Sequence, residues 1–288
     1  ASIGYKLTDM SNLRLGYNMR IYRPGIWYLN PYLNDTDPSY ISQGNSELDS
    51  EKSHAFNLSY SNFTQKFNIN LSARYSFTNN SIENVTKLMP DTEIEGLKNP
   101  TGKDVLYSTY ANIGKTRRAS VSAYVNWNAT PRTRIYMNMS GDYSYMEGSE
   151  GMRNDGWSLF AYGGAQQTLP HDWRISLNVF GQTPWIMLQG KGSSFFDYGL
   201  SVNKSFLNKR LTLSAFASNF FKKYMDQSST TEGAGFIRES SYKYSRQRFG
   251  ISVSYRIGEL KASVKKAART ISNDDVKSGG SGSGGGGE

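Results

Sequence analysis

The chain has no cysteine, only two histidines and no long apolar run, and each absence removes a class of protein. Without cysteine there is neither a disulfide framework nor a thiolate metal or redox site. His54 and His171 have no serine and carboxylate pattern suggestive of a triad, and two histidines are few for a metal site. A spanning helix needs about 20 apolar residues in a row, and no stretch approaches that length. We therefore expect no enzyme, no metal, no cofactor and no helical membrane protein.

The charge is basic, with a formal net value of +9, but the basic residues are scattered over many segments. A nucleic-acid interface would gather them on one helix or one patch. We therefore do not expect a nucleic-acid partner.

What the sequence does have is an apolar–polar alternation with a period of two, typical of strands with one apolar face. The clearest rows run through residues 13–21, 67–77, 119–127, 135–143, 175–179 and 249–257. Six alternate positions cover about eleven residues, roughly 35 Å of strand, which at a tilt of about 45° crosses about 25 Å of membrane. The residues between the apolar ones are mostly Asn, Ser, Gly and Arg, which suit a wet, crowded lumen. We expect an all-β, transmembrane antiparallel barrel.

Breaks in the alternation separate the strands. Tight breaks fall at 9–12, 62–66, 130–132, 169–172 and 207–209, and they alternate with breaks at 23–49, 89–104, 148–155, 189–193 and 227–235. Barrels of this kind have short periplasmic turns and longer outside loops, so we place the second set outside. The pattern requires 105–129 to be one strand that passes through 112–115. It predicts eleven strands, at 1–8, 12–23, 50–61, 66–89, 104–129, 133–148, 155–169, 173–188, 194–206, 210–226 and 236–257.

Eleven is an odd number, whereas bacterial single-chain barrels close with even numbers of strands. Since eleven is half of 22, we expect residues 1–257 to be the C-terminal half of a 22-stranded barrel. The start at Ala1-Ser2-Ile3 lacks a leader pattern, which favours a cut within a longer protein whose N-terminal half supplies the other strands.

Two segments resemble a known family. Residues 44–51, Gly-Asn-Ser-Glu-Leu-Asp-Ser-Glu, resemble the Gly-Asn-Pro-x-Leu-x-Pro-Glu segment of TonB-dependent receptors, with Ser46 and Ser50 in place of the prolines. Tyr22-Arg23-Pro24 with Leu29-Asn30-Pro31-Tyr32 resembles the Arg-Pro…Leu-Asn-Pro loop of the Bacteroidota outer-membrane β-barrel family. The resemblance is specific at 20–60 and diffuse elsewhere.

This resemblance implies a bacterial outer-membrane importer with a 22-stranded barrel, a plug in its missing N-terminal half and a segment there that engages the TonB complex. The implied function is binding and import of a nutrient solute. The alternative is a plugless barrel that acts as an adhesin or assembly scaffold. Expected partners are outer-membrane lipid and lipopolysaccharide, the missing half-barrel and plug, and the TonB complex; a surface lipoprotein stays open.

Two sets of residues are candidates for contacts. Aromatics with nearby carboxylates often grip a polar or sugar-like ligand, although such aromatics also pack a loop on itself. That set lies in the loop at 23–49: Trp27, Tyr28, Tyr32, Asp35, Asp37 and Tyr40. The second set is arginines on the polar face, which could bind an anionic solute but which we expect to pair with plug carboxylates: Arg14, Arg20, Arg74, Arg134, Arg174 and Arg248.

The last segment, 258–288, changes character, with a basic run at 261–269 followed by a Gly/Ser-rich stretch. We expect a periplasmic, flexible tail.

Overall fold

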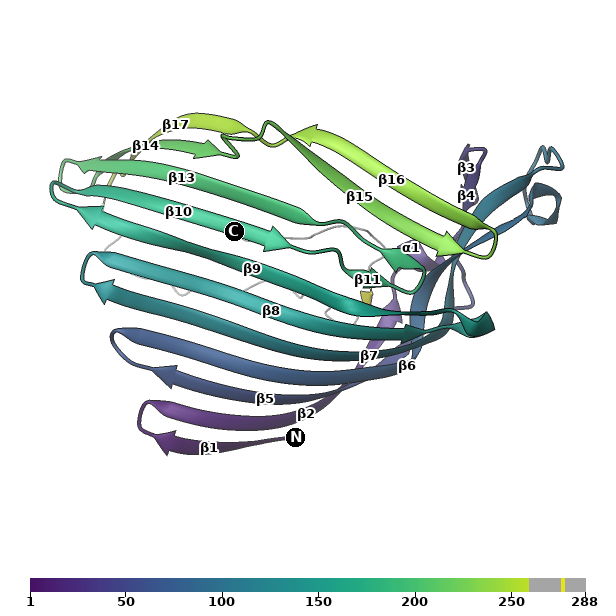
Figure 1. The fold of residues 1–288 in the computed structure, drawn as a ribbon, viewed down its shortest axis with the longest axis horizontal. Helices are drawn as coiled ribbons and strands as arrows, with labels where there is room; N and C mark the ends of the chain where they lie inside the picture. The colour runs from purple at the N-terminus through teal and green to yellow at the C-terminus, as the bar shows by residue number, and fades with distance from the viewer. Residues whose placement is uncertain (259–275, 278–288) are drawn as a thin grey trace.

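The computed structural model describes residues 1–258 and 276–277, and within them eleven strands follow one another in a single curved sheet (Figure 1). Each strand pairs antiparallel with the next along this path. The order is β1 (Ser2–Thr8), β2 (Ser11–Pro24), β5 (Glu51–Phe63), β6 (Phe67–Pro90), β7 (Asp104–Thr130), β8 (Thr133–Glu147), β9 (Arg153–Leu169), β10 (Trp173–Gln182), β13 (Phe195–Phe206), β14 (Leu211–Ser218) and β17 (Arg248–Tyr255).

The expected short turns are confirmed: all five lie at one end of the sheet, on the left in Figure 1. The prediction that β7 passes unbroken through 112–115 is also confirmed. Gly114 makes this passage possible, because a Cβ there would lie 2.0 Å from the Ser81 hydroxyl. The register between β6 and β7 shifts beside Ser81, so the two strands approach closely at an irregular point.

Three predicted strands are broken. β10 ends at Gln182, before Pro184, which lacks the N–H that a central strand needs. β14 ends at Ser218, where Asn219 has a φ of 49°. The strand predicted at 236–257 is divided into β16 (Phe236–Ser245) and β17.

The prediction of a loop at 227–235 is wrong over residues 227–233, because these belong to β15 (Tyr224–Gly233). β15 and β16 form a hairpin, and with β11 (Ile186–Met187) and β12 (Gly190–Lys191) they make a separate four-stranded sheet. Backbone pairing alone satisfies the N–H and C=O groups here, so this hairpin needs no apolar alternation.

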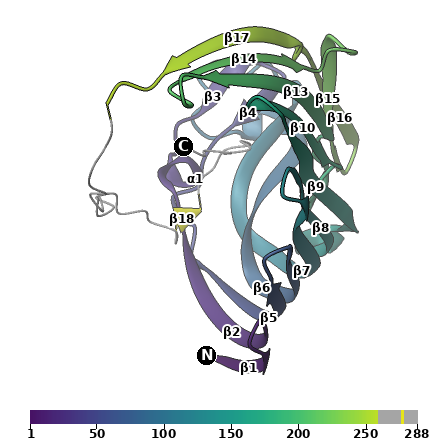
Figure 2. The same cartoon turned by 90° about the vertical axis from the view of Figure 1, so that its left-hand side faces the viewer.

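The register shows that the two faces differ, since paired residues lie on the same face. One face carries rows such as Tyr5, Leu13, Tyr60, Leu71, Ala123 and Met139, and the other carries rows such as Arg14, Ser59, Ser72, Ser122 and Ser140. The polar face is the concave one, because Tyr28 of α1 (Ile26–Leu29), within the curve of the sheet in Figure 2, shares a cavity with Met146 of a polar row.

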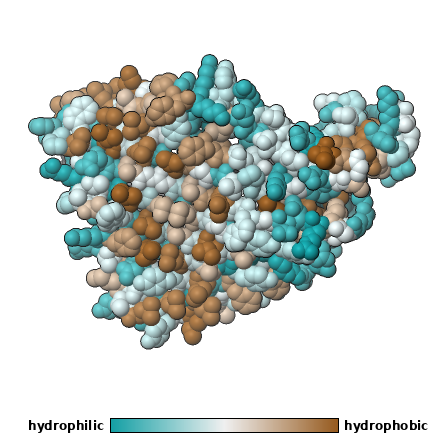
Figure 3. All heavy atoms as spheres, in the orientation of Figure 1, coloured by the Kyte–Doolittle hydropathy of each residue, from teal (hydrophilic) through white to brown (hydrophobic). Residues whose placement is uncertain are grey.

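The convex face is the apolar one. Apolar side chains gather over its left and centre in Figure 3. Hydrophilic ones lie toward the end opposite the short turns, which carries the longer connections and which we call the wide-loop end. Val121, in the middle of β7, is 65% exposed on this face. Exposed apolar rows of this length need an apolar surrounding.

Buried side chains concentrate at the wide-loop end. Three small clusters lie there: Tyr28, Leu48 and Ile82; Ile41, Ile94 and Val105; and Met146, Ile186 and Leu188. They lie under the connections that carry α1, β3 (Asn34–Asp37), β4 (Tyr40–Ser42), η1 (Asp91–Glu93), η2 (Ser149–Gly151) and the β11–β12 turn. The wide-loop end is therefore the part of the sheet where loops and strands form a packed structure.

No helix within the described residues has the length and apolar character needed to span a membrane. A two-residue strand, β18 (Val276–Lys277), pairs in parallel with Arg23 and Pro24 of β2. The basic run and the Gly/Ser-rich stretch predicted as a periplasmic tail lie outside the described residues, at 259–275 and 278–288.

Candidate binding site on the concave face

Helix α1 is fixed against the concave face by its backbone and by Tyr28. Gly44 N–H donates to the Asn30 carbonyl (3.0 Å), and Asn45 N–H donates to the Tyr28 carbonyl (2.6 Å). A Cβ on Gly44 would lie 2.3 Å from the Asn30 oxygen, so this close approach requires glycine. The Tyr28 side chain is 8% exposed, and its ring meets the Tyr110 ring edge-on at 4.5 Å. The loop is thus docked on the wall.

A second connection, the β11–β12 turn, is fixed to the same end. Gln189 Nε2 donates to the Thr86 carbonyl (2.9 Å), and Gln189 Oε1 accepts from the Thr86 N–H (2.7 Å). Ile186 and Leu188 form a buried cluster with Met146. These two hydrogen bonds between the Gln189 side chain and the Thr86 backbone tie β6 to a turn more than a hundred residues later.

Two cavities of about 340 and 350 Å³ lie on the concave face, and the second is lined both by Tyr28 of α1 and by Ile186, Met187, Leu188 and Gln189. Both are lined by Glu83 and Met146, so they adjoin, and together we call them the mouth site. Its other polar lining residues are Tyr22, Tyr28, Glu51, Ser53, Arg74, Ser76, Thr78, Ser81, Asn84, Tyr110, Thr116, Arg118, Gln189 and Thr231.

Charges in the mouth site are balanced, with two carboxylates and two guanidinium groups. Glu51 accepts from the backbone N–H of Ile82, and Glu83 accepts from the Thr116 hydroxyl at 3.5 Å. Arg118 Nε donates to the Ser144 hydroxyl at 3.2 Å. With several hydroxyls between them, these groups can donate to and accept from a polar solute without a large net charge.

Tyr28 contributes a neutral phenol at the junction of loop and wall. Burial, followed by the charges of Tyr110, Glu51 and Glu83, raises the pKa of Tyr28 to about 12. The hydroxyl therefore stays protonated and can donate a hydrogen bond throughout the physiological range.

The structure disperses the predicted aromatic loop residues. Tyr28 lines the mouth site, whereas Trp27 and Tyr32 are 69% and 71% exposed and are not among its lining residues. Asp35, in β3, is also exposed. The loop therefore presents one aromatic to the cavity and two to the surroundings.

Asp37 and Tyr40 lie in the β3–β4 hairpin. Asp37 accepts from the Ser39 hydroxyl (2.7 Å) and from the Ser39 N–H (3.0 Å), and these bonds hold the pKa of Asp37 below its usual range. The guanidinium of Arg238, in β16, lies 3.8 Å from the centre of the Tyr40 ring. This cation–π contact joins two connections that are about two hundred residues apart.

The six predicted arginines all lie in polar rows and are exposed. Their cross-strand partners are short polar residues: Ser59 for Arg14, Ser53 for Arg20, Ser120 for Arg74, Gln166 for Arg134, Asn203 for Arg174 and Ser218 for Arg248. Only Arg74 among them lines the mouth site. Arg14, Arg134 and Arg174 lie near the short turns, whereas Arg20 and Arg248 lie toward the opposite end of the sheet.

Tyr28 and Arg74 are the only sequence candidates among the polar lining residues of the mouth site, and four of the missed residues carry its charges or fix its turn. Arg118 could have been found, because it continues the polar alternation of Ser120 and Ser122. Glu51 begins β5 and Gln189 lies in the β11–β12 turn, where the alternation has stopped. Glu83 lies inside β6, just after the register irregularity at Ser81 that interrupts the alternation. Only the tertiary structure brings them together.

The two histidines are far apart in the fold. His54 lies on the convex face, where its Nδ1 is 2.8 Å from the Tyr17 hydroxyl, and its ring stacks on Phe77 at 4.9 Å. His171 lies in the short turn between β9 and β10 and has a φ of 61°. Within residues 1–258 and 276–277, no group of three His, Cys, Asp or Glu side chains is placed to hold a metal ion.

Comparison with known families gives one match, in which residues 1–255 fit the outer membrane protein beta-barrel family. No curated protein matches the chain.

Solved structures share the fold at low identity. The siderophore receptor PirA from Pseudomonas aeruginosa has a TM-score of 0.56 at 16% identity, over 77% of this chain and 38% of that one. The copper transporter OprC has a TM-score of 0.60 at 14% identity, over 88% and 39%. A mutant of the ferric enterobactin receptor PfeA from Pseudomonas aeruginosa has a TM-score of 0.52 at 16% identity, over 78% and 34%. The chain thus spans under two fifths of these receptors.

Proposed function

The chain belongs to the outer membrane protein beta-barrel family and lies in the outer membrane; on that premise, we propose that it is part of the wall of a TonB-dependent receptor that binds and imports a nutrient solute. The role is transport, not catalysis. The observation that carries the proposal is the mouth site, a hollow on the concave face with two carboxylates and two guanidinium groups, whose second cavity is lined by the docked α1 and the β11–β12 turn.

The position of the mouth site supports this proposal. In a barrel the concave face borders the lumen, and the wide loops face outside. A solute that arrives from outside would meet the docked α1 loop and the β11–β12 turn before it reached the lumen. The fold shared with a siderophore receptor and a copper transporter supports a receptor, while the solute of this protein is a separate question.

Uptake by cells that produce the full-length protein tests the proposal. We expect uptake of one solute from a panel of small polar compounds, and we expect it to stop when the proton-motive force is collapsed. Glu83→Gln and Arg118→Gln should each weaken binding of that solute about tenfold to a hundredfold, because a lost hydrogen bond to a charged group costs about 1.5 to 3 kcal/mol.

Glu239→Gln is the matched control, because Glu239 is an exposed carboxylate on β16 and does not line the mouth site. It should leave uptake unchanged. Uptake that survives loss of the proton-motive force would contradict energised import, and equal effects of Glu83→Gln and Glu239→Gln would contradict the site.

The second candidate is a plugless adhesin or assembly scaffold. The β15–β16 hairpin favours it, because this hairpin leaves the main sheet and carries Ile237 and Tyr242 at 71% and 68% exposure. Apolar side chains displayed on a projecting hairpin suit a protein contact. A full-length gene without a plug, together with unchanged uptake after its deletion, would favour this role.

The proposal also covers what pairs with the two edge strands of the main sheet. β1 and β17 are the two edges of that path, and we infer that a second half-barrel of the same protein pairs with them in a 22-stranded barrel. The exposed concave-face arginines would pair with carboxylates of a plug, and the plug segment would engage TonB. The motif at residues 22–32 supports placement in the Bacteroidota branch.

A further inference from the structure

On the convex face, charged side chains appear one row beyond a row that is rich in aromatic ones. One cross-strand row consists of Tyr17, Phe56, Tyr75, Ala119, Tyr143 and Trp157. The next row toward the wide loops consists of Met19, His54, Phe77, Arg117, Tyr145 and Asp155. In outer-membrane barrels such an aromatic girdle marks the interface between hydrocarbon and headgroups. The row that contains Arg117 and Asp155 therefore lies at the level of the lipid headgroups.

A polar hollow of about 580 Å³ opens at this level. It is lined by Asp49, Ser50, Lys52, His54, Asn79 and Asn80, and we call it the rim hollow. Lys52 and His54 alternate with Ser53 along β5, and their cross-strand partners on β2 are Ile21 and Met19 of the apolar face. The hollow thus opens toward lipid and not toward the lumen.

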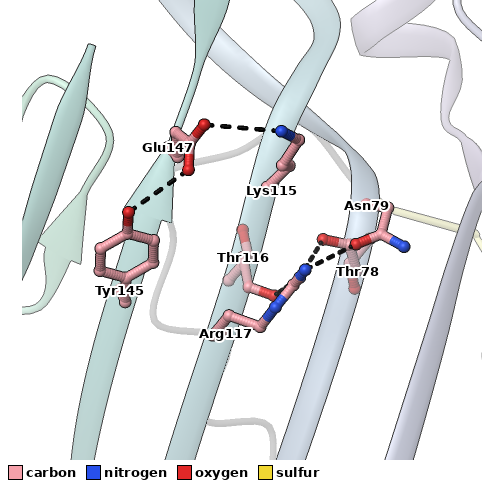
Figure 4. A network of polar contacts seen from close by, with 7 residues as sticks. All are labelled: Thr78, Asn79, Lys115, Thr116, Arg117, Tyr145 and Glu147. Atoms are coloured by element: carbon pink, nitrogen blue, oxygen red, sulfur yellow. Dashed lines mark hydrogen bonds and ion pairs between the residues drawn. The ribbon is translucent and has the colours of Figure 1, made fainter. Parts of the chain in front are cut away.

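Arg117 is held beside the rim hollow. It donates to the Asn79 side-chain oxygen (2.9 Å) and to the Thr78 carbonyl (3.3 Å), as Figure 4 shows. Its guanidinium carbon also lies 5.4 Å from the centre of the Phe77 ring. These contacts direct a fixed cation toward the edge of the hollow, directly above an aromatic side chain.

The neighbouring charges are already paired, but those of the rim hollow are not. Lys115 pairs with Glu147 at 3.5 Å, also visible in Figure 4, and Arg153 with Asp155 at 4.0 Å. Over the described part of the chain, neither Lys52 nor Arg117 forms an ion pair with a carboxylate. Arg117 donates to three neutral oxygens, the carbonyls of Thr78 and Thr116 and the side-chain oxygen of Asn79. Two cations are therefore available to an anion from the membrane.

The hollow also offers hydrogen-bonding groups for a sugar. The Asp49 carboxylate can accept from hydroxyls, and the amides of Asn79 and Asn80 can donate and accept. A simple anionic lipid would use the cations but leave Asp49 opposed to its charge. A phosphorylated sugar satisfies both, with the phosphate toward Lys52 and Arg117 and its hydroxyls toward Asp49. Acyl chains attached to that sugar would lie along the aromatic row below.

We propose that the rim hollow binds the phosphorylated sugar headgroup of an outer-leaflet glycolipid, with Lys52 and Arg117 as its phosphate ligands. The site is on the lipid-facing surface, apart from the mouth site, so it does not depend on solute import. At the rim hollow the lipid is a specific ligand of the protein, and not only the medium around the convex face.

Native mass spectrometry of the full-length protein in detergent tests the proposal, with diphosphorylated lipid A as the probe. Lys52→Gln combined with Arg117→Gln should reduce retained lipid A at least tenfold. Arg132→Gln combined with Lys209→Gln is the matched control, because it removes the same charge from exposed short turns at the opposite end. That control should retain the lipid. Equal retention by both double variants would overturn the proposal.

Two further arms define the ligand. Lipid A without phosphates should bind at least tenfold more weakly, and equal binding would overturn the phosphate role. Inorganic phosphate at millimolar concentration should not displace lipid A, and full displacement would identify a free-anion site instead. Lys52→Arg keeps the charge and should retain lipid even if the double variant folds poorly, so lipid loss in Lys52→Arg would refute recognition by charge.

Discussion

Val121→Lys places a charge on the lipid-facing side at mid-membrane. Val121 is 65% exposed on the convex face, four residues below Arg117 and six above Trp127 along β7. With about 3.3 Å per residue and a tilt of about 45°, these intervals correspond to about 9 and 14 Å along the membrane normal. A lysine at that depth costs about 2 to 4 kcal/mol. We expect unfolding free energy to fall by about 3 kcal/mol, roughly a 150-fold change in the folding equilibrium.

Ser122→Lys is the control, because Ser122 is the next residue and points to the concave face. Its hydroxyl lies 2.6 Å from that of Ser72, so the change should cost about 1 kcal/mol for one hydrogen bond. Denaturant unfolding of the full-length protein in lipid vesicles would measure both variants. Equal costs, or a larger cost for Ser122→Lys, would refute the assignment of faces.

Three other predictions concern the wide-loop end. Arg238→Gln should remove about 0.5 to 1 kcal/mol of cation–π contact with Tyr40 and raise protease sensitivity of the β3–β4 hairpin, and unchanged cleavage rates would count against that contact. Gly44→Val should undock the α1 loop and abolish solute binding while the barrel still folds, as a binding assay and circular dichroism would show. The pKa of Tyr28 is raised from 10 to about 12, so the unfolded chain loses the phenol proton at lower pH than the folded protein does. The contribution of Tyr28 to the free energy of unfolding is therefore full below pH 10 and is lost between about pH 10 and 12. Alkaline titration of tyrosinate absorbance should lose that late-ionising component in Tyr28→Phe.

The main sheet was predictable because the membrane imposes a repeating pattern on it. Val121 is apolar because it faces lipid, and Ser122 is polar because it faces a wet lumen. The same constraint predicted β7 through Gly114, where a turn signal could have suggested a break.

The wide-loop end was less predictable because that constraint ends there. The Ser228–Thr231 stretch reads as a loop, yet it pairs with β16, since a hairpin in water needs only backbone partners. The contacts of Tyr28 with Tyr110 and of Gln189 with Thr86 join residues far apart in sequence, and no local pattern predicts them.

Spin labels at successive residues 119–127 of β7 test the two-faced wall most directly, and the absence of cysteine from these 288 residues makes single-site labelling simple. In membranes, we expect the oxygen collision rate to be high for labels at odd positions and low for labels at even positions. The same collision rate at odd and even positions, or maxima at the even ones, would contradict it.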